Sequence, residues 1–128
     1  MNRIADTHVL LWLAYQPEQL SARARAALGD SSITAVFFSL ASIWEIAIKQ
    51  SINKLRLPVP LGDFVADLRK AGFRYLPIDA PDAFRIAELP LHHRDPFDRM
   101  LVAQAQQREL GLISGDPMLA PYGVDVLW

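Results

Sequence analysis

Short apolar segments rich in β-branched and aromatic residues alternate with longer helical segments along the chain. We expect strands at residues 3–6, 32–38, 73–78, 112–114 and 124–128. Helices are expected from residue 7 onward, at 20–28, from Ser39 or Ser42 to about residue 54, and at 64–71, 83–89 (with its start at Pro81) and 95–111, with a turn or short helix at 117–120. This alternation, without β-hairpin signals, predicts an α/β fold, a three-layer α/β/α sandwich with a mainly parallel central sheet.

The segment 32–38 shows why a parallel sheet is favoured. It contains β-branched and aromatic residues, and no polar alternation follows Thr34. A strand of that composition suits burial on both faces, which helices on the two sides of a parallel sheet provide. In such sheets ligands bind at the carboxyl ends of the strands, where strand turns into helix. Side chains at those turns are therefore the first candidates for function.

Composition limits the classes of function. The 128 residues are expected to form a single domain, residues 1–128, with its own core. The 13 basic and 14 acidic residues give a net charge of −1, so no global positive charge attracts nucleic acid. Because the chain has no cysteine and no pair of histidines on one helix face, a zinc site is disfavoured. No apolar run is long enough to span a membrane, and a cytoplasmic protein is expected.

The segment 93–105, HRDPFDRMLVAQA, has a well-marked helix start. Asp95 can cap the helix, and Pro96 suits its first position. Asp98 lies in line with the apolar stripe that begins at Leu101 and should face the core. A carboxylate in that position must be paired, hydrogen-bonded or bound to a metal, because bare burial is costly. Stabilising the helix start is the competing use of Asp98.

Three further acids lie at predicted strand-to-helix turns. Asp6 ends the first strand and could simply cap the next helix. Glu45 is the only charge in a long apolar run, although it could complete a capping box from Ser42 or pair with Lys49. Asp116 lies in a Ser-Gly-Asp-Pro turn, where Asp is also a natural cap. Each acid alone therefore has an ordinary structural explanation.

Taken together, the four acids predict a metal site. The carboxyl ends of parallel strands share one edge, so these side chains should meet there. Carboxylates brought together repel one another unless a counter-charge is present. Mg²⁺ or Mn²⁺ is the usual partner of an all-oxygen site, and such a metal can bind phosphate oxygens and activate a water. The metal would also allow a nearly neutral protein to hold RNA or DNA.

Other side chains near this edge have competing interpretations. His92 and His93 could contact phosphate or act as an acid, or could be ordinary polar loop residues. Arg94 and Arg99 could contact RNA phosphates, or could form salt bridges with neighbouring acids. The alternative class is a non-catalytic, Mg²⁺-binding receiver-like regulatory domain, which needs a phosphoacceptor Asp after a middle strand and a Lys after a later one. Asp79 is the one candidate acceptor, and no lysine partner is evident.

Four motifs occur in order along the chain: DTHVLLW at 6–12, SIWEIAIK at 42–49, HHRDPFDR at 92–99 and SGD at 114–116. This set resembles the successive motifs of PIN-domain ribonucleases, most closely the toxin members of prokaryotic toxin–antitoxin pairs (VapC-type). The resemblance implies a PIN fold and Mg²⁺-dependent endonuclease activity on structured RNA, with Mn²⁺ as a substitute ion. It also implies a small antitoxin protein that blocks the site, and a homodimer or higher assembly.

The resemblance assigns the family's acidic quartet to Asp6, Glu45, Asp98 and Asp116. Asp6, Asp98 and Asp116 would bind the metal, whereas Glu45 could ligate, orient a water or act as a base. Thr7 and Ser114 could hydrogen-bond the ligands. Asp95 is the capping residue and stands outside the quartet. A PIN nuclease that serves RNA processing, and is not a toxin, is the alternative function.

Overall fold

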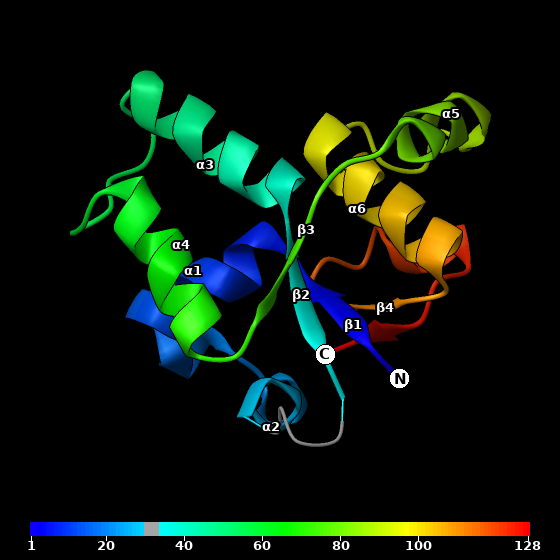
Figure 1. Ribbon diagram of the computed structural model, residues 1–128. Helices are drawn as coiled ribbons and strands as arrows, with labels where there is room; N and C mark the ends of the chain where they lie inside the picture. Colours follow the sequence, from blue (N-terminus) through cyan, green and yellow to red (C-terminus); the bar gives the residue numbers. More distant parts are fainter. Residues whose placement is uncertain (30–33) are drawn as a thin grey trace.

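Figure 1 shows the computed structural model, which describes residues 1–29 and 34–128. A five-stranded sheet forms its centre, with strand order β3-β2-β1-β4-β5. The strands are β1 (Arg3–Ala5), β2 (Val36–Ser39), β3 (Arg74–Leu76), β4 (Gly111–Ile113) and β5 (Val126–Leu127). The helices are α1 (Thr7–Tyr15), α2 (Ala22–Gly29), α3 (Leu40–Ser51), α4 (Leu61–Lys70), α5 (Ala80–Glu88) and α6 (Pro96–Arg108), with short 3₁₀ helices η1 (Pro17–Gln19) and η2 (Ala120–Tyr122). Neighbouring strands all run parallel, as predicted.

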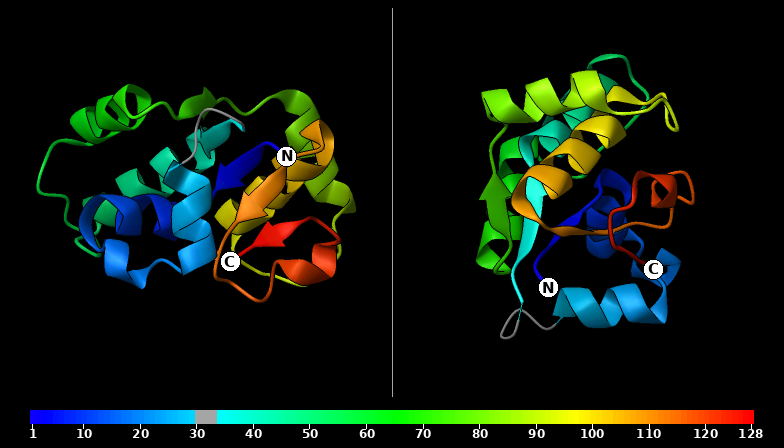
Figure 2. Two further views of the ribbon diagram at one scale, coloured as in Figure 1. Left: turned by 90° about the horizontal axis from the view of Figure 1, so that it is seen from below. Right: turned by 90° about the vertical axis from the view of Figure 1, so that its right-hand side faces the viewer.

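Both faces of the sheet are covered by helices. Alternate side chains of a strand point to opposite faces. Ile4 and Leu112 therefore join the apolar cluster that includes α6, whereas their neighbours Ala5 and Ile113 join the cluster that includes α1, α2 and α4. All four side chains are fully buried. The two views of Figure 2 show α5 and α6 together on one side of the sheet, which confirms the predicted α/β/α sandwich.

Several elements begin or end at other residues than predicted. The strand predicted at 32–38 is β2, which begins at Val36, and residues 32 and 33 lie outside the described residues. The first turn of α4 begins at Leu61, because the N–H groups of Asp63 and Phe64 both donate to the Pro60 carbonyl. The segment 117–119 forms a turn, and residue 120 begins the 3₁₀ helix η2. In the described part of the chain, no helix is long and apolar enough to cross a membrane.

Helix α3 starts at the earlier of its two predicted caps. The Ser39 hydroxyl accepts a hydrogen bond from the Ala41 N–H at 3.0 Å, so Ser39 is the cap and the helix follows β2 without a loop. The helix ends at Ser51, before the predicted residue 54. Asn53 adopts a left-handed conformation with φ of 59°, and the next N–H, of Lys54, donates to the Lys49 carbonyl. This turn reverses the chain after α3.

Candidate functional site

The carboxyl edge of the sheet gathers the four predicted acids. Ala5 of β1 pairs with Ile113 of β4, so Asp6 and Ser114, which follow them, leave the sheet side by side. The Asp6 N–H also donates to the Ile113 carbonyl at 3.1 Å. The other acids reach the same edge from the N-terminal half of α3, from the first turn of α6 and from the turn after β4, and they are Glu45, Asp98 and Asp116.

Asp6 is buried at the centre of this edge. Its side chain is the N-cap of α1, where Oδ1 accepts a hydrogen bond from the Val9 N–H at 2.8 Å. Asp6 therefore does cap α1, which the sequence analysis gave as the alternative to metal binding. The cap uses Oδ1 and leaves Oδ2 outside this hydrogen bond. Burial raises the pKa of Asp6, although a hydrogen bond from the Ser114 side chain and the cap itself act in the opposite direction.

Glu45 is almost fully buried, with 3 % of its surface exposed. Lys49, one helical turn later, forms an ion pair with it at 2.6 Å between Nζ and Oε2. The alternative capping box from Ser42 does not form, because α3 is capped by Ser39 and the Ser42 hydroxyl bonds to the Thr7 hydroxyl at 2.9 Å. Lys49 thus compensates one of the acids at this edge.

Asp98 lies in the first turn of α6 and its side chain is 20 % exposed. The N-cap of α6 is Asp95, whose Oδ1 accepts from the N–H groups of Phe97 and Asp98 at 2.8 and 3.3 Å. This confirms Asp95 as the predicted cap, so the Asp98 carboxylate is not needed in that role. Burial raises the pKa of Asp98 to about 7, and the negative charge of Asp95 acts in the same direction. Asp6 and Glu45 add to the rise, which shows that the acids act on one another.

His93 connects two of these acids, a role that sequence reasoning left undecided. Its Nδ1 accepts a hydrogen bond from the Asp95 N–H at 3.0 Å, so the ring proton is placed on Nε2. Nε2 lies 2.8 Å from Oδ2 of Asp116 and 3.2 Å from Oδ2 of Asp98. The sequence signal is its place two residues before the cap Asp95, which ties the ring to the start of α6.

The turn after β4 places Asp116 beside this histidine. The Asp116 N–H donates to the Ser114 hydroxyl at 3.1 Å, and its Oδ1 accepts from the Met118 N–H at 2.9 Å. Ser114 therefore contacts the backbone of one predicted ligand and the side chain of another, Asp6. Thr7, in contrast, bonds to Ser42 and ties α1 to α3.

The two arginines of the motif differ in their surroundings. Arg94 is exposed to solvent. The Arg99 guanidinium instead turns back onto the chain before it, where it donates to the carbonyls of Leu89, Pro90 and His93 at 3.0 to 3.4 Å. Its position favours a structural role, which is to hold the loop that carries His93. Asp79, the acceptor that a receiver domain would need, pairs with Arg108 at 3.1 Å on another part of the molecule.

The donor set fits a hard divalent cation. One ligand atom each from His93, Asp98 and Asp116 lie within 4.8 Å of one another. In the tautomer described above His93 donates its Nε2 proton, so the carboxylate oxygens are the donors that remain. Oxygen donors with a surplus of negative charge are what Mg²⁺ and Mn²⁺ prefer. A bound cation would also offset the burial and the repulsion that together raise the pKa of Asp98.

Comparison with known proteins places the chain in a family. The model of the PIN domain matches residues 3–123. A comparison with curated proteins finds no match. Among solved structures, VapBC2 from Rickettsia felis, bound to a DNA fragment from its promoter, is similar with a TM-score of 0.75 and 10 % identity, covering 99 % of this chain and 98 % of the other.

Two further solved structures share the fold. FitAcB from Neisseria gonorrhoeae has a TM-score of 0.67 and 21 % identity, over 98 % of this chain and 96 % of the other. A toxin–antitoxin complex from Klebsiella pneumoniae has a TM-score of 0.61 and 20 % identity, over 99 % and 97 % of the two chains. At these identities the likeness establishes the fold. Because the PIN-domain model matches nearly the whole length of this chain, the chain belongs to the PIN-domain family.

Proposed function

We propose that this protein is a metal-dependent endoribonuclease, the toxin of a type II toxin–antitoxin pair, which cleaves structured RNA. The observation that carries the proposal is the gathering of acids from four separate segments at the carboxyl edge of a parallel sheet. Membership of the PIN-domain family supports a nuclease, and the fold shared with toxin–antitoxin complexes supports the toxin assignment.

Three of the four acids are proposed as metal ligands, and the fourth, Glu45, is paired with Lys49. Asp6, Asp98 and Asp116 are the proposed ligands of Mg²⁺, or of Mn²⁺ in its place. The bound ion would supply charge stabilisation at the phosphate and an activated water for attack on the phosphodiester. Glu45 is held by Lys49, so its carboxylate has a fixed direction, whether it ligates, orients a water or accepts a proton.

The neighbouring polar groups would hold the ligands in place. The His93 N–H holds the Asp116 carboxylate at 2.8 Å, and Ser114 links the Asp116 backbone to Asp6. Such partners fix the direction of a ligand and commonly change metal affinity when they are removed. Arg94 is the exposed cation closest in sequence to the acids, and we propose it as a contact for RNA phosphate.

Cleavage of RNA by the purified protein tests the proposal. We expect cleavage with Mg²⁺ or Mn²⁺ that stops with a chelator. The substitutions Asp98→Asn and Asp6→Asn should each reduce the rate about 100-fold or more, because each removes a charge that holds the metal. End mapping on total RNA would identify the target and the cleaved bond.

A matched control is available in another helix. Asp63 also lies in the first turn of a helix, α4, but it is exposed. Figure 1 shows α4 and α6 on opposite sides of the molecule. Asp63→Asn should therefore leave cleavage unchanged. Cleavage that survives Asp98→Asn and Asp6→Asn, in variants shown to be folded by circular dichroism, would refute the proposed site.

The partner proposals have tests of their own. We expect a short open reading frame upstream that encodes a DNA-binding antitoxin, and a stable complex of the two proteins upon co-expression. The isolated toxin should self-associate, which light scattering would report as a mass of two chains or more. A nuclease of RNA processing would instead lack the neighbouring antitoxin gene and would not arrest growth when expressed alone.

A further inference from the structure

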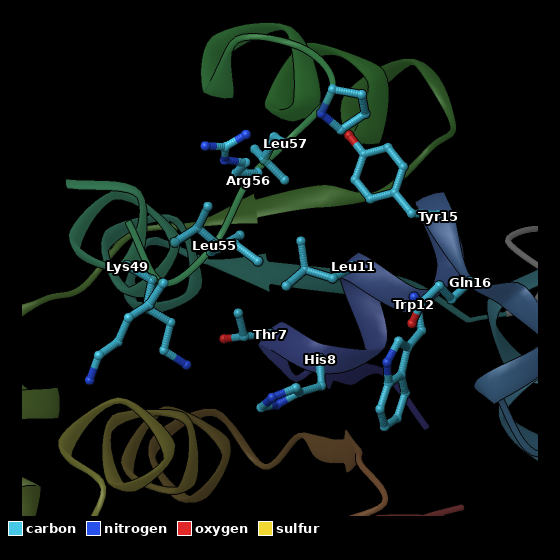
Figure 3. Close-up of a pocket in the computed structure, with 13 residues that line it drawn as sticks. Thr7, His8, Leu11, Trp12, Tyr15, Gln16, Lys49, Leu55, Arg56 and Leu57 are labelled. Atoms are coloured by element: carbon cyan, nitrogen blue, oxygen red, sulfur yellow. The ribbon is translucent and has the colours of Figure 1, made fainter. Parts of the chain in front are cut away.

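A cavity lies beside the acids and is not explained by the proposed catalytic role. Its volume is about 580 Å³, and it is bounded by α1, the end of α3 and the segment 54–58 that follows the turn at Asn53 (Figure 3). Leu11, Leu55 and Leu57 supply its apolar wall, as Figure 3 shows. Cavities of this size that combine apolar walls with a few polar groups are suited to small organic groups.

The cavity opens next to the acids at the carboxyl edge. Thr7, which follows Asp6 directly, lines it, and so does Lys49, which is paired with Glu45. A molecule in the cavity would therefore lie beside any group bound at the acids. A continuous polymer could occupy both places at once.

The charges around the cavity favour an anionic occupant. Among the residues that the structure describes, its lining contains cations and no acid, although the chain as a whole carries a net charge of −1. Lys54 and Arg56 are exposed, and within residues 1–29 and 34–128 neither forms an ion pair. His8, on α1, adds a polar ring at the mouth. A nucleic-acid strand carries phosphates on both sides of the bond that is cleaved. Positive charge beside the acidic edge would bind such a neighbouring phosphate.

The cavity also offers aromatic surface. The rings of Trp12 and Tyr15 border it at the end away from Lys49 (Figure 3). Tyr15 stacks on Phe64, with ring centroids 6.1 Å apart, and this contact fixes its direction. Single-stranded nucleic acid is commonly bound by basic grooves with aromatic side chains on which bases stack.

We propose that this cavity binds one nucleotide of the RNA strand adjacent to the cleaved phosphodiester, an inference that rests on the proposed nuclease function. The base lies against the leucine wall and the aromatic rings, and its phosphate lies at Lys54 and Arg56. The combination of two exposed cations, Lys54 and Arg56, with an apolar interior distinguishes this occupant from a purely apolar peptide segment. The cavity then supplies substrate affinity that the acidic edge alone cannot provide.

RNA binding by a variant that cannot cleave tests this inference. All proteins carry Asp98→Asn, and fluorescence anisotropy follows a short labelled single-stranded oligoribonucleotide. Lys54→Ala with Arg56→Ala should weaken binding about tenfold and lower the slope of log Kd against log salt by about 1.4, for two lost phosphate contacts. The matched control, Arg23→Ala with Lys70→Ala, removes the same charge from exposed positions on α2 and α4 and should change neither quantity.

A second measurement tests the base. An oligomer of the same length without bases should bind about tenfold more weakly, and Tyr15→Ala should reduce this difference because it removes a ring from the cavity. Equal binding of the two oligomers would exclude a base from the cavity. Unchanged RNA binding by the Lys54 and Arg56 double variant would overturn the inference. A double variant that loses binding to the antitoxin but still binds RNA as before would assign the cavity to the antitoxin instead. Failure of the wild-type protein to cleave RNA with Mg²⁺ would instead refute the proposed function itself.

Discussion

Asp98 is held where an ionised carboxylate is costly. Its side chain is 20 % exposed, and burial together with the neighbouring acids raises its pKa from 3.8 to about 7. In the unfolded chain the same group keeps its ordinary pKa. The folded protein without metal therefore binds a proton that the unfolded chain has already lost across this interval of pH.

Asp98→Asn should consequently stabilise the metal-free protein at neutral pH. Wild-type stability includes a contribution from Asp98 that falls as the pH rises from about 4 to about 7, because the folded state must release the proton. Asparagine has no proton to release. The difference in free energy of unfolding between variant and wild type should grow across this window to a few kcal/mol. Urea denaturation with a chelator at a series of pH values measures it, and a difference independent of pH would contradict the argument.

The residues at this edge show what sequence can and cannot locate. Asp6 and Asp116 could be placed because each follows a recognisable strand, and parallel strands end at a common edge. His93 could not be placed in the same way. It lies in a loop, where no periodicity fixes the direction of a side chain, and its partner Asp116 comes from a different loop. For the same reason the sequence does not predict that the Arg99 side chain turns back to the carbonyls of Leu89 and Pro90.

At the level of elements, α5 and α6 are joined by a buried ion pair. Arg108 of α6 donates to both carboxylate oxygens of Asp82, at 2.5 and 3.0 Å, and Asp82 is only 1 % exposed. Burial by itself raises the pKa of Asp82, but the hydrogen bonds from Arg108 and from the Asp79 N–H outweigh it, and the net pKa is lowered. The carboxylate is therefore ionised and depends on its partner.

Arg108→Ala should destabilise the protein strongly. The substitution leaves a buried carboxylate without its cation, which typically costs about 3–5 kcal/mol. Glu88→Ala is the control, because it removes a carboxylate of α5 that is 72 % exposed and pairs with Arg85, and it should cost less than about 1 kcal/mol. The free energies of unfolding in urea at neutral pH give both values. Equal losses would show that the pair between α5 and α6 contributes no more than a surface contact.

Helix starts were predictable where a capping residue was recognised. Asp95 and Ser39 both cap the helices expected of them. The helix expected to start at Pro81 and to cover 83–89 begins slightly earlier, at Ala80, because Asp79 and Asp82 form a capping box that apolar periodicity does not indicate. In the structure the Asp79 N–H donates to the Asp82 side chain at 2.8 Å, which closes the first turn. Local hydrogen bonds of this kind compete with apolar periodicity in setting the boundary.

At the level of the whole molecule, alternation of strands and helices was sufficient to predict the layers. The inner strands β1, β2 and β4 are largely buried on both faces, and only crossover helices can cover a parallel sheet in that way. The cavity beside α1 could not be predicted from the sequence, because it depends on the path of the chain after Asn53. That path combines a left-handed residue with long-range packing of Leu55 and Leu57. The acidic edge and the basic cavity next to it are therefore properties of the assembled fold.

The stability of the whole domain should depend on the metal. A ligand that binds only the folded state raises its stability by RT ln(1 + [L]/Kd), which is about 2.7 kcal/mol at 100 times Kd. For a domain of this size, Mg²⁺ or Mn²⁺ at that level should raise the Tm of the wild type by roughly 10 °C. The rise should be larger above pH 7, since Asp98 must lose its proton to bind the metal. Asp98→Asn and Asp6→Asn should lose most of the rise at matched ionic strength, and Asp63→Asn should keep it. An equal rise in all four proteins would mean that the metal binds elsewhere.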